Sequence, residues 1–487
     1  MHTCFVKQRS LWQYTRLLWA GLLVGVALSS GCGTRPPEWK AITLETTQPP
    51  PPSIKTDNQL VVYLDKSESM AGYVAADTQK TTVFSQTLLE LREVVSQLSP
   101  KLAGVYRTVD AKVSSPAFRE MELAEVANKR DYFNGQETNL VGAIKAFSLP
   151  LTKTGSDSQG NAETDAVPRL HVLVTDGVQS TKQQPSESSC VSGSDAYCVK
   201  SSIQELLEKG WAGTILGVRS EFVGKVYPEK GGGAFTYQSK SDTGSYRPFY
   251  LYIFSPDRIA LDELVVRLKK KLRPVLGSED AIREYSLSGP YSEGVAQVEV
   301  GLAEAKKYVR VTQEKPTDKE PARLTLRVNL DTERNSVGAQ NVTLIVTPTW
   351  NGHALASGMP KELPGLLKWE LQEVELADNA KDKSRQRQPE LKIVKQGANE
   401  PGQMVVQLSV GWTPGTGSPV WRLFRLVGRL NVEEDYPPWV EQWSTKEDSK
   451  PENANRTFNL VGSLSGLWNN PQLKKQAIAE IWVRVGP

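Results

Sequence analysis

Residues 60–69 read Leu-Val-Val-Tyr-Leu-Asp-Lys-Ser-Glu-Ser, an apolar run that ends in one acidic and two hydroxyl side chains at alternate positions. The apolar residues predict a buried strand, and the polar residues predict a loop at its end. Asp65, Ser67 and Ser69 can therefore turn three oxygens toward one point. Two hydroxyls and a carboxylate, with no sulfur or imidazole among them, suit a hard divalent cation such as Mg²⁺.

Two later segments carry oxygen ligands of the same kind. Thr138 precedes a helix-like stretch at residues 140–147, and Asp176 follows a second apolar run at residues 170–175. If the two apolar runs are parallel strands of one sheet, their carboxyl ends share an edge and Asp176 lies near Asp65. The sequence thus predicts that Asp65 and Asp176 share one edge of the sheet, and it offers Ser67, Ser69 and Thr138 as further oxygen donors.

These five residues, in this order, resemble the metal-ion-dependent adhesion site of the von Willebrand factor A (VWA) family. The resemblance implies that the Ser and Thr hydroxyls bind the metal directly or through water, while the Asp residues act mostly through water. It also implies a protein ligand whose exposed acidic side chain completes the coordination of Mg²⁺, with Mn²⁺ and Ca²⁺ as alternative ions. The competing interpretation is a domain of the same fold that has lost its metal. Glu68 stands where many relatives carry Gly, so it either tightens cation binding or discourages an acidic ligand.

Residues 58–280 alternate strand-like and helix-like segments. Near-continuous apolar strands between helices predict a mainly parallel sheet that is covered on both faces. We therefore expect an α/β VWA domain with a Rossmann-like sheet. The spacing of apolar residues predicts helices near residues 84–98, 117–127, 140–147, 202–209 and 257–272.

Residues 281–487 show recurrent strand-like stretches between Gly, Pro and Asn turns, with little helical periodicity. This pattern predicts a β-rich region of one or two sandwich-like modules, and the polar run at residues 378–390 is a candidate break between them. Trp439 and Trp443 follow two prolines in this region. They either stack on sugar rings or, as is commoner, pack inside the protein.

The first 31 residues read as an export signal. Basic residues precede an apolar core at residues 17–28, which is too short to be a good membrane span, and small residues follow it. Cys32 comes next, and the segment resembles a bacterial lipobox, which implies that Cys32 is acylated and becomes the N-terminus. The alternative is an ordinary cleaved signal peptide with an incidental Cys.

Residues 32–57 are rich in proline and predict an extended tether that holds the following domain away from a bilayer. Where lipoproteins are sorted to the outer membrane, an Asp directly after the acylated Cys typically retains the protein at the inner membrane. Gly33 stands at that position here, which favours anchoring in the outer membrane, facing the periplasm.

Charge and cysteine content agree with an exported protein. Removing the signal lowers Lys+Arg from 58 by three to 55, equal to Asp+Glu at 55, so there is no electrostatic argument for nucleic acid. Cys190 and Cys198 then form an even pair in a polar loop after Asp176, and a disulfide is the expected outcome in an oxidising compartment. We expect this loop to form a wall beside the cation, unless the disulfide only protects a surface loop.

The leading hypothesis is a lipid-anchored protein of the bacterial cell envelope, not an enzyme, that binds a protein ligand through the metal. A second is a structural or assembly component of an envelope complex that acts through its β-rich region. A third is a metal-dependent hydrolase, which would need a general base such as Glu68 or Glu137. The chain carries no catalytic serine elbow, zinc-protease, phosphate-loop or dinucleotide motif.

Overall fold

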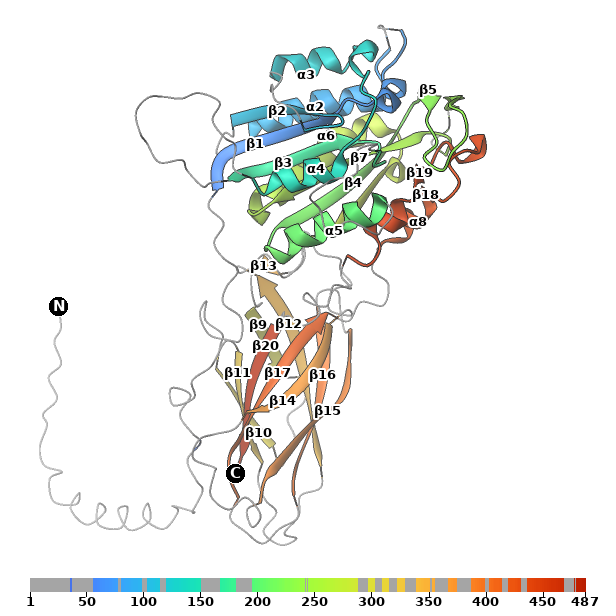
Figure 1. The fold of residues 1–487 in the computed structure, drawn as a ribbon. Coiled ribbons are helices and arrows are strands. Elements are labelled where there is room, and N and C mark those ends of the chain that lie inside the picture. Colours follow the sequence, from blue (N-terminus) through green and yellow to red (C-terminus); the bar gives the residue numbers. More distant parts are fainter. Residues whose placement is uncertain are drawn as a thin grey trace, which may run out of the picture.

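The apolar run at residue 60 forms strand β1 (Thr56–Asp65) of a six-stranded sheet in the computed structural model of the chain (Figure 1). The strand order is β2–β1–β3–β7–β4–β8. The other strands are β2 (Ala103–Val109), β3 (Val167–Thr175), β4 (Ala212–Ser220), β7 (Arg247–Ser255) and β8 (Ile282–Ser286). The structure describes residues 36, 56–77, 80–98, 103–113, 120–149, 167–180, 195–240, 242, 244–287, 297–302, 309–314, 322–328, 339–350, 353–354, 367–374, 387–398, 403–413, 419–430, 436–467, 477 and 479–487.

Successive residues of β1 enter two different cores because their side chains point to opposite faces of the sheet. Val61 and Tyr63 belong to one core, and Leu60 and Val62 belong to the other. The first core includes residues of α4 (Leu140–Phe147) and α5 (Asp195–Glu208), and the second includes residues of α2 (Val83–Gln97), α3 (Glu120–Val126) and α6 (Arg258–Leu276). The five helices that the apolar spacing predicted are thus confirmed, although α5 begins seven positions earlier than expected.

The predicted fold class, a mainly parallel Rossmann-like VWA sheet, is wrong. β1 pairs in parallel with β2 and β3, but β7 runs antiparallel to β3 and to β4, and β8 runs antiparallel to β4. Two of these five pairings are parallel and three are antiparallel, so the sheet is mixed. A strand buried on both faces is apolar throughout whatever the direction of its neighbours. The apolar runs therefore predicted burial correctly and direction incorrectly.

The C-terminal region contains two further sheets (Figure 1). One has the order β10–β11–β20–β17–β14, and in the other β12 pairs with β9, β13 and β16, and β16 pairs with β15. Alternate residues of β16 are buried, as expected for a strand with one face on a core. The strands are β9 (Gln297–Leu302), β10 (Val309–Glu314), β11 (Ala322–Val328), β12 (Gln340–Trp350), β13 (His353–Ala354), β14 (Leu367–Val374), β15 (Pro389–Ala398), β16 (Met404–Trp412), β17 (Arg422–Leu430) and β20 (Ala479–Gly486).

Residues 436–467 leave this region and lie against the six-stranded sheet (Figure 1). We call them the returning segment. Trp443 packs against Gly217 of β4, where a Cβ atom would lie 2.7 Å from the indole, and Trp439 donates a hydrogen bond to the carbonyl of Glu284 in β8. Both indoles are buried, so here the packing interpretation of these tryptophans is confirmed. The segment contains α8 (Pro438–Gln442), β18 (Ser444–Thr445), β19 (Thr457–Phe458) and α9 (Leu460–Leu464).

A small hairpin, β5 (Val223–Val226) and β6 (Phe235–Gln238), completes the first domain. Among the residues that the structure describes, no helix is both long and apolar enough to cross a bilayer. The export signal, the tether and the candidate break at residues 378–390 lie wholly or largely outside the described residues, so these boundaries stay predictions.

Candidate functional site

The five predicted metal ligands meet at one edge of the sheet. Asp65 is the last residue of β1, and Asp176 directly follows β3. Because β1 and β3 are parallel, with Leu64 opposite Val174, the two carboxylates emerge at the same end. This edge is the place that the sequence predicted for them.

Asp65 is fully buried and holds the site together. Its carboxylate accepts hydrogen bonds from the backbone N–H of Ser67 at 2.9 Å and from the hydroxyl of Thr175 at 2.8 Å. The hydroxyl of Thr138 lies 3.3 and 3.4 Å from its two oxygens. The Ser67 and Ser69 hydroxyls lie 2.9 Å apart. Groups from three segments of the chain thus meet at this carboxylate.

Thr138 is positioned by its own backbone. Its N–H and carbonyl form a bridge with Ser180, with N···O distances of 2.8 and 3.0 Å. Asn139, the next residue, caps α4 by accepting a hydrogen bond from the N–H of Gly142. The start of the helix and the segment after β3 therefore fix where the Thr138 hydroxyl lies.

The electrostatics of this edge favour a cation. Burial and, after it, the neighbouring Asp176 carboxylate raise the pKa of Asp65 to about 7, against the opposing hydrogen bonds from Ser67 and Thr175. A divalent ion beside Asp65 would stabilise the charged form that burial and the Asp176 carboxylate disfavour. Three hydroxyls and two carboxylates also form the hard, all-oxygen donor set that Mg²⁺ prefers. The residues present therefore fit the predicted ion, although no group of three His, Cys, Asp or Glu arranged to hold a metal occurs in the described part of the chain.

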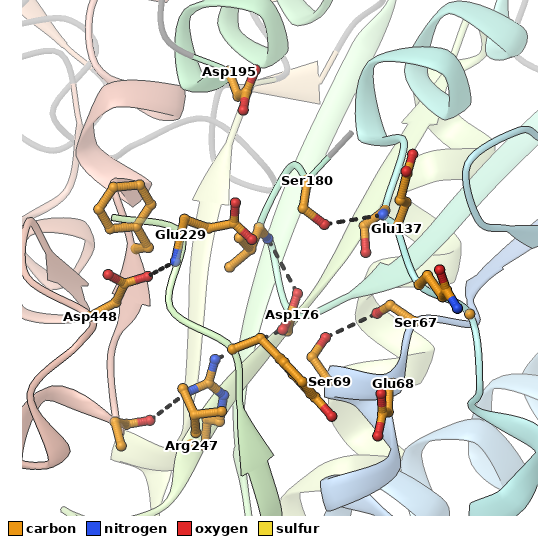
Figure 2. Close-up of a pocket in the computed structure, with 18 of the residues that line it drawn as sticks. Ser67, Glu68, Ser69, Glu137, Asp176, Ser180, Asp195, Glu229, Arg247 and Asp448 are labelled. Carbon is orange, nitrogen blue, oxygen red and sulfur yellow. Dashed lines mark hydrogen bonds and ion pairs between the residues drawn. The ribbon is translucent and has the colours of Figure 1, made fainter. Parts of the chain in front are cut away.

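A pocket of about 450 Å³ opens over this edge (Figure 2). Ser67, Ser69, Thr138 and Asp176 line it, while Asp65 lies buried beside them. Five more carboxylates line the walls: Glu68, Glu137, Asp195, Glu229 and Asp448. Glu68 and Glu137 are the residues that a hydrolase would use as bases.

Glu229 shows how crowded these acids are. Burial, and then the charges of Asp176, Asp448 and Asp195, raise the pKa of Glu229 to about 7. Asp448 is anchored beside it, because the backbone N–H of Glu229 donates to the Asp448 carboxylate at 2.6 Å. The wall of the pocket is therefore acidic, although Glu229 carries only part of its negative charge near neutral pH.

The returning segment supplies one side of the pocket, and sequence analysis missed it. Its residues Asp448, Asn453, Ala454, Arg456 and Phe458 all line the cavity. The link to the first domain is direct, since the Thr457 hydroxyl lies 2.9 Å from the Tyr250 hydroxyl of β7. The only signal in the sequence was a break in strand alternation around the two tryptophans.

Arg247, the first residue of β7, was also missed. Its side chain is 8% exposed, and its Nη2 atom lies 3.8 Å from the Asp176 carboxylate. Its Nη1 atom donates to the carbonyl of Ala454 in the returning segment at 2.7 Å. A buried cation therefore shares the pocket with the predicted metal ligands (Figure 2). An arginine at the start of an apolar strand does not by itself predict a buried position in a pocket.

The predicted cysteine features are only partly visible. Cys32 and Cys190 lie outside the described residues, and Cys198, in α5, is disulfide-bonded. The loop that we expected to form a wall beside the cation also lies outside them, but the residues on either side of it, Ser180 and Asp195, both line the pocket.

Comparison of the chain with protein-family models, with curated proteins and with solved structures finds no match. The family resemblance of the five residues therefore stays a prediction, and function has to be inferred from the geometry of this chain alone.

Proposed function

We propose that this chain is a lipid-anchored binding protein of the bacterial cell envelope that holds a protein ligand through a divalent cation, Mg²⁺ in the first place. The observation that carries the proposal is the convergence of Asp65, Ser67, Ser69, Thr138 and Asp176. These residues come from three separate segments, and four of them line one open pocket. Their order resembles that of the VWA adhesion site; the resemblance concerns the site and does not extend to the sheet.

Each residue has a role that follows from its contacts. Ser67, Ser69 and Thr138 offer hydroxyl oxygens to the ion. Asp65, which is buried and accepts three kinds of hydrogen bond, orients these groups. Asp176 supplies negative charge at the pocket surface. The ion, when bound, supplies a positive centre that can take a carboxylate oxygen of the ligand.

The acidic wall makes binding depend on the cation. Without an ion, the six carboxylates that line the pocket repel an acidic side chain, and the charges of Arg247 and Arg456 offset only two of them. A divalent ion would offset two more of these charges and would place a positive centre where the ligand's carboxylate binds. A partner whose acidic side chain is flanked by basic ones would fit the centre and the wall together.

The metal site is tested by calorimetry on the full chain in detergent, titrated with MgCl₂. We expect Thr138→Ala and Asp65→Ala to abolish the binding heat, because one removes a ligand and the other removes the group that orients the hydroxyls. Ser148→Ala is the matched control: this hydroxyl lies at the opposite end of the same helix, α4, and donates to the carbonyl of Lys145. If both site variants bind Mg²⁺ as the parent does, the assignment of the site is wrong.

The ligand is sought by capture from a detergent extract of the cell envelope, with and without EDTA. A partner of the metal site should be retained by the parent in Mg²⁺, released by EDTA and absent with Thr138→Ala. A partner that remains bound in all three cases would instead support an assembly role that does not use the pocket.

A further inference from the structure

Arg247 is a buried cation with a fixed orientation. Its guanidinium lies 5.3 Å from the centre of the Phe222 ring, and its Nη1–H is held by the carbonyl of Ala454 at 2.7 Å. The group is therefore held from the first domain and from the returning segment, and it still lines the pocket.

The hydrogen-bonding capacity of this guanidinium is not used up. An arginine has five N–H donors, and the Nε–H of Arg247 has no partner within the described residues. The Asp176 carboxylate is the nearest anion, but its separation of 3.8 Å from Nη2 is too long for a hydrogen bond. Nε is itself buried, so an anionic oxygen entering the pocket would meet the terminal Nη atoms, and Nη2 already faces the acidic edge of the pocket at this distance from Asp176.

Metal binding would increase the need of the Arg247 guanidinium for an anionic partner. Asp176 is both a predicted ligand of the ion and the nearest anion to Arg247, so the ion would draw on the same charge that now faces the guanidinium. Two cations would then share one pocket with Asp65 and Asp176 as their nearest buried anions. Another negative charge between them would relieve the repulsion.

We propose that Arg247 is the second receptor group for the ligand's carboxylate: the ion takes one oxygen, and the guanidinium donates to the other. This inference rests on the proposed function and deepens it. With one carboxylate oxygen on the ion, the second can accept from the guanidinium fork, whereas a carboxamide presents an NH₂ group there and a hydroxyl has no second oxygen. Arg247 is thus the residue that selects an acidic side chain over Asn, Gln or Ser, despite the acidic wall.

The test uses acetate as the probe and the full chain in detergent, in saturating MgCl₂ and in EDTA. Acetate binding is followed by the width of its methyl NMR signal, and acetamide serves as the neutral probe of the same shape. Mg²⁺ binding is measured separately by calorimetry. The variants are Arg247→Met and Arg247→Lys, and the matched control is Lys225→Met, which removes an exposed positive charge one residue away from the pocket residue Val226.

We expect Arg247→Met to bind acetate at least roughly tenfold more weakly than the parent in Mg²⁺, as the loss of a charge-assisted hydrogen bond predicts. Its Mg²⁺ affinity should be unchanged or higher, because a repelling charge has been removed. The preference for acetate over acetamide should fall by a similar factor. Arg247→Lys keeps the charge but loses the fork, so it should recover only part of the preference, and it provides the test if the Met variant does not fold. Lys225→Met should change acetate binding less than about threefold.

The outcomes separate the two proposals. A parent that binds Mg²⁺, together with Arg247 variants that bind acetate as the parent does, would overturn the role of Arg247 and leave the metal site standing. A loss as large in Lys225→Met as in Arg247→Met would also overturn it, since the effect would then be one of overall charge. A parent that shows no Mg²⁺ binding would overturn the proposed function, and the inference with it.

Discussion

His171 should make the first domain lose stability as the pH falls. Burial lowers the pKa of His171 to about 3, with a smaller contribution from the nearby charge of Arg107 and against the opposing hydrogen bond to the Pro168 carbonyl. Since a carbonyl only accepts, the Nε2 atom, 3.1 Å away, carries the proton, and the ring is neutral in the folded state. In the unfolded chain the ring titrates at its ordinary value of about 6.5.

The sign follows from proton counts. Between about pH 6.5 and about pH 3 the unfolded chain binds one more proton at this residue than the folded chain does. The free energy of unfolding therefore falls as the pH falls through that interval, by about 1.4 kcal/mol per pH unit. At about pH 4.5, two units below the unfolded pKa, the loss from His171 amounts to about 2.7 kcal/mol.

The variant that tests this is His171→Gln, whose side-chain amide can donate to Pro168 in place of Nε2–H. It loses the ring contact with Phe147, at a centroid distance of 4.9 Å, but that cost is the same at every pH. Urea unfolding, followed by tryptophan fluorescence at about pH 7 and about pH 4.5, gives the two differences. The parent should lose about 2.7 kcal/mol more than the variant. Equal losses would show that His171 does not titrate between the two states as described.

Three other perturbations have defined outcomes. Gly177→Ala should lower the free energy of unfolding by about 2 kcal/mol or more, because Gly177 has φ 81° and a Cβ would lie 2.8 Å from the Tyr250 ring. The control is Gly231→Ala, at φ 96° with nothing within 4 Å of the added Cβ, so its thermal unfolding measures the backbone part of the cost alone. Trp443→Ala should cost about 3–5 kcal/mol, and limited proteolysis should then cut the returning segment; Trp369→Ala, in the C-terminal sheets, should cost as much without that cut. Cys32→Ser should move the protein from the membrane fraction to the soluble or unprocessed fraction, and finding the parent in the soluble fraction would contradict the lipid anchor.

The site could be predicted further than the fold. Asp65 and Asp176 each follow a buried apolar run, and the parallel pairing of β1 with β3 brings them together without any other information. Strand order beyond that pair depends on contacts across long stretches of chain. β7 enters between β3 and β4 and reverses the direction of the sheet, and nothing in its apolar run distinguishes it from a parallel strand.

Two contributors to the pocket could not be read from the sequence for a different reason. Arg247 looks like a polar residue at the end of a strand, and only the packing of Phe222 and Ala454 around it makes it a buried cation. Asp448 lies in a segment whose short elements carry no clear period, more than two hundred residues from the motif. Local pattern describes a residue's own element, whereas these roles depend on neighbours that are remote in the chain.

The connection between β17 and β20 has a consequence for how this protein could have been assembled. The two strands are antiparallel neighbours, with Gly428 opposite Ala479, so the chain leaves and re-enters the same sheet at adjacent points. A short turn in place of residues 431–478 would keep this ladder intact, but the first domain would lose one side of the pocket together with the packing of Trp439 and Trp443 on β8 and β4. Residues 431–478 are therefore an insertion in the C-terminal sheets that contributes to the pocket of the first domain. A gene without this insertion would still encode the strands of the six-stranded sheet and of the two C-terminal sheets. Exchange of residues 431–478 alone could therefore change the ligand preference, although this segment is far in sequence from the residues proposed to hold the ion.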